Sequence, residues 1–236
     1  MENLKSEKVL TAKELASYFD HTLLRANATV SEFKKLCDDS KRYGFCMVAI
    51  NPAPVKLCKT FLEGSHVHVG AAIAFPLGQT TLEDKLSEIR NAIKNGADEI
   101  DYVVNLTKLK AGDTAYIESE MARITDICRE FSVVSKVIFE NCYLTEDEKK
   151  TLCHIAAKVK PDFIKTSTGF GTGGATLEDV ALMKKETEGS GVKIKAAGGI
   201  RTLKTALEMI DLGASRIGST SSVAIMEEYM AHSPLL

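Results

Sequence analysis

Short apolar runs alternate with longer amphipathic segments along this chain. Eight runs have the length and composition of buried strands, and they cover Tyr18–Thr22, Phe45–Ile50, His66–Ala74, Glu99–Val104, Lys136–Glu140, Asp162–Thr166, Val192–Ala197 and Ser215–Gly218. Apolar residues at helical spacing predict helices between nearly all of them, for example over Thr81–Asn95, Ala115–Phe131, Glu146–Lys158 and Leu203–Leu212. Strands that alternate with helices in this way pair in parallel through right-handed crossovers.

The expected helix ends carry capping signals. Four helix starts have a threonine three residues before a carboxylate, a spacing typical of a capping box, and these threonines are Thr29, Thr80, Thr145 and Thr176. Three helix ends have a glycine at the expected C-cap, just before an apolar strand, and these glycines are Gly44, Gly96 and Gly213. The chain therefore repeats the order helix, glycine, strand.

Eight such units in 236 residues predict an α/β protein with a closed (β/α)₈ fold, a TIM barrel. An open, doubly wound sheet is the alternative. We expect one domain over residues 1–236, with no linker or low-complexity segment. Met1–Ala16 is expected to form a short N-terminal helical extension.

Composition narrows the choice of partners. Hydrophobic residues make up 44% of the chain and charged residues 26%, which is typical of a globular domain with a large core. The net charge is −2 and the pI is about 6.2, so no basic field is present to attract nucleic acid or an anionic membrane. The charged segment Met1–Lys13 lacks the apolar core of a signal peptide, so we expect a cytoplasmic protein.

The six cysteines show no metal-binding or disulfide pattern. They are scattered, with no C-x-x-C pair, and the simplest interpretation is that they are small buried hydrophobic residues. We expect no bound metal and no cofactor.

The strongest chemical signal is a lysine inside a predicted strand. Phe163 and Lys165 point to the same face because side chains alternate along a strand. Burial beside an aromatic ring favours the neutral amine, which is a nucleophile. A free lysine with a pKa near ~10.4 is only about 0.04% neutral at pH 7. Lys195 occupies the same position in the next strand, where a second ammonium group would also disfavour charge on Lys165.

Other polar residues lie late in strands, where barrels place their reacting groups. Asp101 lies in an otherwise apolar run, and a buried carboxylate there needs a partner such as lysine. Asp20 is a second inward candidate, and Asn51 and Glu140 end two further strands. Lys193 is expected at the opposite end of its strand, with its head in water.

Three histidines have less specific patterns. His66 and His68 share a strand face and could bind a metal, but no third ligand is evident, and a packed or surface pair is favoured. His21 adjoins Asp20 and could simply orient it.

Glycines and hydroxyl residues gather after the last three strands. Gly169–Gly174 and Gly198–Gly199 form two glycine-rich loops, and Gly218–Ser221 precedes the last helix. Backbone N–H groups in loops at this end of a barrel commonly bind phosphate. The alternative is that the glycines serve only as turns and the strand lysines only in structural ion pairs.

The chain resembles the deoxyribose-phosphate aldolases, which are class I aldolases. The motifs that carry the resemblance are Phe163-Ile164-Lys165-Thr166-Ser167-Thr168-Gly169 and Lys195-Ala196-Ala197-Gly198-Gly199-Ile200-Arg201-Thr202, with the Asp101 strand and Asp20-His21-Thr22-Leu23-Leu24. Together they span essentially the whole chain. The resemblance implies reversible cleavage of 2-deoxy-D-ribose 5-phosphate to D-glyceraldehyde 3-phosphate and acetaldehyde, with no metal or other cofactor.

The resemblance also implies residue roles. Lys165 would form the Schiff base, Lys195 would lower the pKa of Lys165, and Asp101 would take part in a proton relay. The expected substrate-binding residues, several of them around the phosphate, are Asp20, Thr168, Gly169, Gly171, Gly198, Gly199, Gly218, Thr220 and Ser221. A homodimer or homotetramer is implied as well.

Two positions depart from the family pattern. Some relatives have a phosphate-binding lysine where this chain has Phe170, so phosphate would depend more on backbone donors here. Many relatives have a cysteine where this chain has Ala49. Two other functions are compatible with the sequence: another Schiff-base aldolase or transaldolase with a different acceptor, and a catalytically silent barrel that binds a sugar phosphate as a regulator or scaffold.

Overall fold

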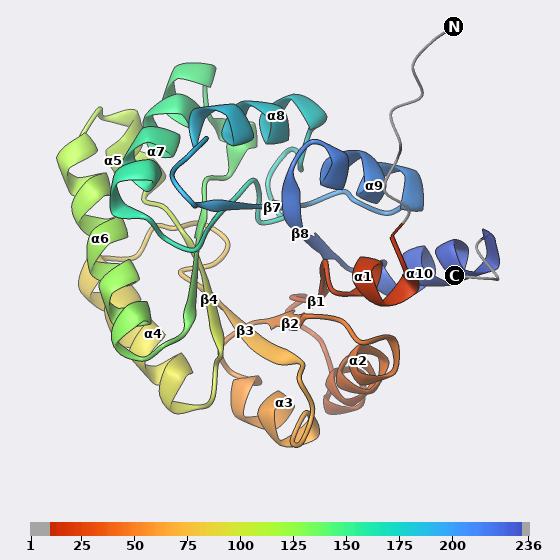
Figure 1. The fold of residues 1–236 in the computed structure, drawn as a ribbon. Coiled ribbons are helices and arrows are strands. Elements are labelled where there is room, and N and C mark those ends of the chain that lie inside the picture. Colours follow the sequence, from red (N-terminus) through yellow and green to blue (C-terminus); the bar gives the residue numbers. More distant parts are fainter. Residues whose placement is uncertain (1–9, 233–236) are drawn as a thin grey trace, which may run out of the picture.

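The computed structural model describes residues 10–232, in which eight parallel strands form a closed barrel (Figure 1). The strands are β1 (Phe19–Leu23), β2 (Met47–Ile50), β3 (His68–Ile73), β4 (Glu99–Val103), β5 (Val134–Ile138), β6 (Phe163–Lys165), β7 (Lys193–Ala197) and β8 (Ala214–Ser219). Each strand pairs with its neighbours in sequence, and β8 closes the barrel against β1. The predicted TIM barrel is confirmed, and the open doubly wound sheet is wrong.

Helices surround the barrel (Figure 1). They are α1 (Ala12–Ala16), α2 (Val30–Tyr43), α3 (Val55–Phe61), α4 (Leu82–Lys94), α5 (Leu106–Lys110), α6 (Thr114–Glu130), α7 (Glu146–Val159), α8 (Leu177–Glu186), α9 (Leu203–Asp211) and α10 (Ser222–His232), with a 3₁₀ turn at η1 (Asn141–Tyr143). Of the expected N-terminal extension, α1 is helical, and residues 1–9 lie outside the described part. Within residues 10–232 no helix is both long enough and apolar enough to cross a membrane.

Three of the four predicted N-caps are confirmed. Thr29, Thr145 and Thr176 each precede the helix that their spacing predicted. The prediction at Thr80 is wrong, because Thr81 caps α4 and accepts a hydrogen bond from the Asp84 N–H at 3.2 Å. The helix begins at Leu82, whose side chain is buried, and the cap is therefore the residue directly before it.

The predicted helix-ending glycines all lie in the left-handed region. Their φ angles are +75° at Gly44, +103° at Gly96 and +106° at Gly213, a conformation that glycine adopts without a steric penalty. The strand bounds differ from the prediction mainly in three places. The second strand starts two residues later than predicted, at Met47 rather than Phe45. The fifth strand starts two residues earlier, because Val134 pairs with Glu99, and the third starts at His68, which leaves His66 outside it.

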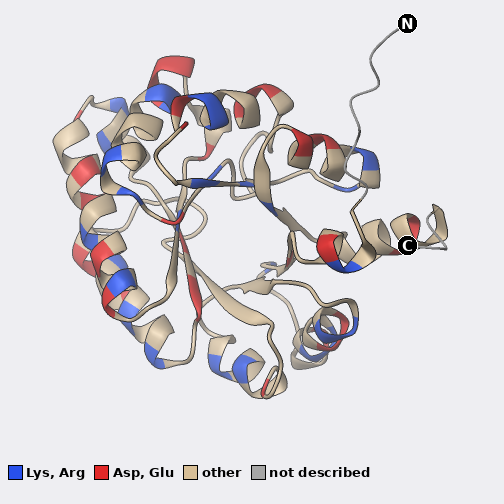
Figure 2. Ribbon diagram, viewed as in Figure 1, with Lys and Arg blue, Asp and Glu red and all other residues tan. Residues whose placement is uncertain are grey.

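The two faces of the barrel sheet are chemically opposite. Outward side chains such as Ile100 and Tyr102 are fully buried against the helices and belong to the hydrophobic core. The inward side chains of the same strand, Glu99 and Asp101, are also buried. Figure 2 shows charged residues on barrel strands as well as on the outer faces of the helices. The apolar core is therefore a ring between sheet and helices, and the barrel interior is largely ionic.

One buried ion pair lies outside the barrel. Lys85 on α4 and Glu120 on α6 are both fully buried, with 2.7 Å between Nζ and Oε1. The same ammonium donates to the Val103 carbonyl oxygen at 2.7 Å, and Glu120 Oε2 accepts from the Asn105 N–H at 3.0 Å. This pair fastens both helices to the carboxyl end of β4, the strand that carries Asp101.

Replacing one member of this pair should destabilise the fold strongly. We expect Lys85→Met to lower the free energy of unfolding by about 3–5 kcal/mol, because Glu120 is left as an unpaired buried charge. The double variant Lys85→Met/Glu120→Gln should recover much of that loss. Lys34→Met, which breaks the exposed pair between Lys34 and Asp38, should cost less than about 0.5 kcal/mol. Urea unfolding measures the free energy of unfolding of all three variants. A Lys85→Met variant as stable as the parent would contradict this prediction.

Candidate active site

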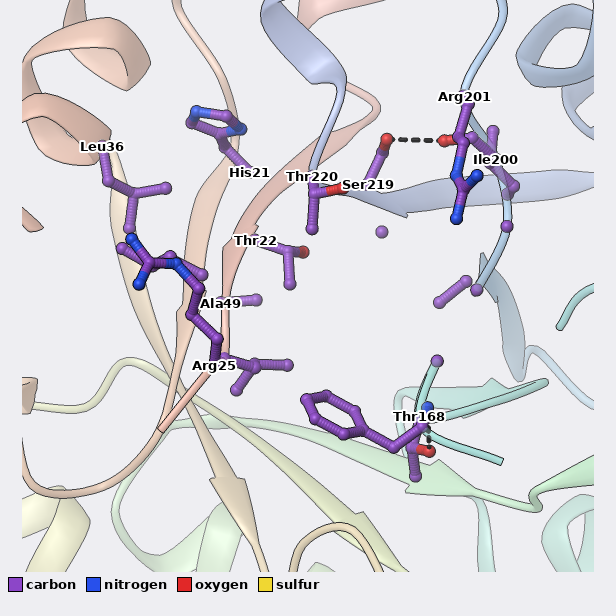
Figure 3. Close-up of a pocket in the computed structure, with 18 of the residues that line it drawn as sticks. His21, Thr22, Arg25, Leu36, Ala49, Thr168, Ile200, Arg201, Ser219 and Thr220 are labelled. Atoms are coloured by element: carbon purple, nitrogen blue, oxygen red, sulfur yellow. Dashed lines mark hydrogen bonds between the residues drawn. The ribbon is translucent and has the colours of Figure 1, made fainter. Parts of the chain in front are cut away.

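A pocket of about 640 Å³ opens at the carboxyl ends of the barrel strands. Lys165 and Lys195 lie among its lining residues. Figure 3 shows Arg25 and Leu36 on one side of the opening and Thr168, Ile200 and Arg201 on the other. Parallel strands bring their carboxyl ends to one mouth of a barrel, which is why residues far apart in sequence meet here.

One carboxylate oxygen joins the two predicted active lysines. Asp101 Oδ2 accepts from Lys165 Nζ at 2.9 Å and from Lys195 Nζ at 2.7 Å. The exposed fractions are 4% for Lys165, 3% for Asp101 and 0% for Lys195. Asp101 on β4 and Lys195 on β7 come from strands that are not neighbours, so their contact crosses the barrel interior. The structure thus brings together the three residues that the sequence singled out.

Burial changes the ionisation of this cluster. Burial lowers the pKa of Lys165 to about 8, Asp101 opposes that shift, and Lys195 adds to it. Burial would raise the pKa of Asp101, but the three lysines Lys136, Lys165 and Lys195 outweigh it and hold that pKa well below its usual range. At neutral pH Asp101 is therefore ionised, and a useful fraction of Lys165 is the neutral amine.

Further charges extend the cluster down the barrel. Asp20 bridges Lys195, at 2.5 Å, and Arg216, at 2.7 Å. Lys136 donates to Asp101 Oδ1 at 2.7 Å and also pairs with Glu99. Lys136, Glu99 and Arg216 were not predicted from the sequence as residues of the site. Strand alternation was the available signal, because Glu99 lies two residues before Asp101 and Arg216 two residues before Gly218.

The glycine loops pack tightly against each other above the lysines. Ala175 N–H donates to the carbonyl oxygens of Ala197 at 3.1 Å and Gly198 at 3.0 Å. A Cβ at Gly174 would lie 2.2 Å from the Gly198 oxygen, so this contact requires glycine. The expected binding residues that line the pocket are Thr168, Gly169, Gly198, Gly199, Gly218 and Thr220.

A family model described as "DeoC/LacD family aldolase" matches residues 15–225. The chain belongs to the DeoC/LacD family of aldolases. The resemblance inferred from the motifs is confirmed.

Relatives of this DeoC/LacD family member cover nearly its whole length. It is 55% identical over 217 residues to a deoxyribose-phosphate aldolase of Lactobacillus acidophilus, covering 92% of the chain and 91% of the relative. It is 50% identical over 220 residues to a deoxyribose-phosphate aldolase of Bacteroides thetaiotaomicron, covering 93% and 92%. A solved structure described as a tetrameric deoxyribose phosphate aldolase from Aeropyrum pernix superposes with a TM-score of 0.87 at 30% identity, covering 94% of the chain and 93% of that structure.

Three expected binding residues of this aldolase-family chain lie outside the pocket lining. Asp20 is fully buried beneath Lys195, where its carboxylate forms ion pairs with Lys195 and Arg216. Gly171 packs on Cys142 and Glu140, and a Cβ added there would lie 2.7 Å from the Cys142 Sγ. Ser221 lies just before α10, and its N–H donates to Ser219 Oγ at 2.9 Å.

Glu140 shapes the loop after β6. Its Oε1 accepts from the Thr168 N–H at 3.1 Å, and its Oε2 accepts from the Thr168 hydroxyl. The same hydroxyl accepts from the Phe170 N–H at 3.0 Å, and the Phe170 ring packs edge-on against Phe75. Asn51, in contrast, donates to the Leu24 carbonyl oxygen at 3.0 Å and does not line the pocket.

His68 pairs with a carboxylate of the barrel, and His21 is one of the residues that line the pocket. His68 is exposed, and its Nδ1 lies 2.8 Å from Glu99 Oε1, an interaction that raises the pKa of His68. His21 packs on Phe45, its Nδ1 has no hydrogen-bond partner within the described part of the chain, and burial lowers its pKa to about 4. His21 and Asp20 point to opposite faces of β1, as adjacent strand residues do, so His21 does not orient that carboxylate. In the described residues no three potential ligands group around a metal position.

The reactivity of Lys165 should rise steeply through mild alkaline pH. Its pKa is lowered to about 8, so the neutral amine increases as pH rises and reaches half of its maximum there. We expect labelling of Lys165 by acetaldehyde and cyanoborohydride to follow that curve, measured by peptide mass spectrometry from pH 6 to 10. Exposed Lys34 is the internal control. A Lys165 curve that coincides with that of Lys34 would disprove the activation.

Proposed function

We propose that this protein catalyses the reversible aldol cleavage of 2-deoxy-D-ribose 5-phosphate to D-glyceraldehyde 3-phosphate and acetaldehyde. The observation that carries the proposal is the buried Lys165 amine, with its lowered pKa, at a pocket that it shares with Lys195. Deoxyribose-phosphate aldolases at 55% and 50% identity support the choice of substrate. The activity belongs to deoxyribose phosphate catabolism.

The amine supplies the covalent step. Neutral Lys165 Nζ attacks the C1 aldehyde of the open-chain sugar, and loss of water leaves an imine. In its protonated form the imine accepts the electron pair of the C2–C3 bond as that bond breaks. The C3 hydroxyl loses its proton and becomes the aldehyde of D-glyceraldehyde 3-phosphate. Protonation of C2 and hydrolysis of the imine then release acetaldehyde and the free amine.

The neighbours of Lys165 suit the proton movements of this sequence. The neighbouring Lys195 disfavours a positive charge on the Lys165 amine. Asp101 does not line the pocket, but it contacts both Nζ atoms through one oxygen. It is therefore positioned to pass a proton between the two lysines, and through them to a bound water or substrate hydroxyl. We assign Lys165, Lys195 and Asp101 as the catalytic residues.

The phosphate is expected on the glycine side of the pocket. Backbone N–H groups of Gly198 and Gly199 and the start of α10 are suitable anion donors, and Arg201 adds a positive charge at this side. We retain as proposed substrate-binding residues the set Asp20, Thr168, Gly169, Gly171, Gly198, Gly199, Gly218, Thr220 and Ser221, with Asp20 acting through Lys195. A pocket of about 640 Å³ has room for a pentose phosphate.

Covalent trapping tests the function directly. Acetaldehyde and borohydride should add a single ethyl group, about +28 Da, at Lys165. Lys165→Ala should lose this adduct and at least about 10³-fold in turnover of deoxyribose 5-phosphate. A regulator or scaffold would bind the sugar phosphate without trapping. A different Schiff-base aldolase would trap acetaldehyde but fail to cleave deoxyribose 5-phosphate.

Phe170 should set the phosphate affinity. Its side chain is 55% exposed at the pocket rim, so Phe170→Lys should lower KM for deoxyribose 5-phosphate about 2- to 5-fold at low salt, through a partly screened ion pair. The kcat should hardly change, and unphosphorylated deoxyribose should gain nothing. Phe170→Leu is the matched control for loss of the ring. An equal effect of both substitutions would refute the role of charge.

We also propose that the protein assembles as a homodimer or homotetramer in the cytoplasm. The tetrameric aldolase from Aeropyrum pernix, with the same fold, supports the assembly. The net charge of −2 supports the absence of nucleic-acid and membrane partners.

A further inference from the structure

A third lysine lies under the active pair. Lys136 on β5 is fully buried in the barrel, and its Nζ donates to Asp101 Oδ1 at 2.7 Å. The same ammonium pairs with Glu99, lies 3.5 Å from Met47 Sδ, and is 5.9 Å from the centre of the Phe163 ring. It does not line the pocket, so it does not touch a bound substrate.

Lys136 determines which oxygen of the Asp101 carboxylate is available to Lys165 and Lys195. It occupies Oδ1, and the other oxygen is left to Lys165 and Lys195. A carboxylate held on both oxygens cannot rotate without breaking a buried ion pair, which costs several times more than an exposed one. The orientation of Asp101 toward the two active lysines therefore depends on Lys136.

The charges inside the barrel do not balance when every lysine is protonated. The network contains three carboxylates, on Asp20, Glu99 and Asp101, and four cations, on Lys136, Lys165, Lys195 and Arg216. An uncompensated charge in a buried site is unfavourable. Loss of one proton leaves three cations against three carboxylates.

Lys165 is the member that loses this proton most easily. Among residues 10–232 its ammonium pairs only with Asp101 Oδ2, and it shares that oxygen with Lys195. Lys195 has a second carboxylate partner in Asp20, and Lys136 has a second in Glu99. Protonated Lys165 is thus the cation with the least compensation.

We propose that Lys136 is a positioning residue of this site: its ammonium orients Asp101 and supplies the surplus positive charge that leaves Lys165 as the neutral amine. The inference rests on the proposed Schiff-base function and adds a residue that acts on it through Asp101. Without Lys136, a protonated Lys165 would balance the remaining charges, and Lys165 would keep its proton to higher pH.

The test is the pH dependence of imine formation in the Lys136→Met variant. It is measured as the labelling of Lys165 by acetaldehyde and cyanoborohydride. The groups that face Lys136 or Lys165 from the surrounding elements are Asp20, Cys46, Glu99, Asp101, Cys128, Lys195 and Arg216, with His68 behind Glu99. We expect the midpoint to move up from about 8 by roughly one pH unit or more, which slows labelling at pH 7 about 10-fold. Labelling at pH 10 should return to the parental rate.

Lys193→Met is the matched control. Lys193 lies on the inward face of β7 and places its Nζ 5.5 Å from the centre of the same Phe163 ring, but it is exposed and makes no contact with Asp101. In the Lys193→Met variant the pH midpoint of Lys165 labelling should equal that of the parent. An equal shift in both variants would mean that any lost lysine charge suffices, and would overturn the assignment to Lys136.

Glu99→Gln should shift the Lys165 labelling midpoint in the opposite direction. This second variant tests the charge argument if Lys136→Met does not fold. Removing a carboxylate increases the surplus positive charge, so the Lys165 midpoint should move below that of the parent. A midpoint that is unchanged or raised would overturn the charge argument. Lys136→Met with native circular dichroism but slow labelling even at pH 10 would do the same, because a defect of packing alone is not rescued by pH.

Trapping and cleavage assays on the parental protein distinguish a failure of the proposed function from a failure of the role proposed for Lys136. A parent that neither traps acetaldehyde at Lys165 nor cleaves deoxyribose 5-phosphate refutes the proposed function, and the role of Lys136 falls with it. A parent that does both, beside a Lys136→Met variant with an unshifted midpoint, leaves the aldolase intact and refutes only the role of Lys136.

Discussion

The shared carboxylate of Asp101 is the interaction on which the site depends. Three ammonium groups converge on its two oxygens, at 2.7 to 2.9 Å. Such an arrangement is stable only where the carboxylate is ionised, and the three cations ensure this by holding its pKa far down. The same crowding of positive charge acts against protonation of Lys165, the least compensated of the three. One contact therefore links the stability of the barrel interior to the protonation of Lys165.

Because charged side chains occupy the barrel interior, the hydrophobic core lies outside the barrel, between the strands and the helices. Apolar side chains on the outward face of the strands pack against the helices, and charged side chains fill much of the inner space. The ring of apolar packing holds the strands in register, so it fixes the distances between the charges inside. The Lys85–Glu120 pair adds a local anchor at the end of β4. Precision at the site is thus inherited from packing outside it.

The loops above the lysines add recognition to this rigid base. Close contact of Gly174 with Gly198 joins the loops after β6 and β7, and Glu140 fixes Thr168 in the first of them. The backbone of these loops is held without a charged side chain at position 170, where Phe170 packs against Phe75. The phosphate site that we propose on this side would then depend on N–H groups and on Arg201 at the rim.

The sequence alone determined the barrel, its strands and the central three residues. Periodicity and capping signals are local, and Lys165, Lys195 and Asp101 each stand out against an apolar strand. It missed Lys136, Glu99 and Arg216, which resemble ordinary charged residues near strand ends. It also placed the cap of α4 one residue early and gave no sign that Asp20 lies beneath Lys195. Only the tertiary structure decided which charges face one another, because ion pairs across a barrel join strands that are distant in sequence, and local patterns carry no information about such distances.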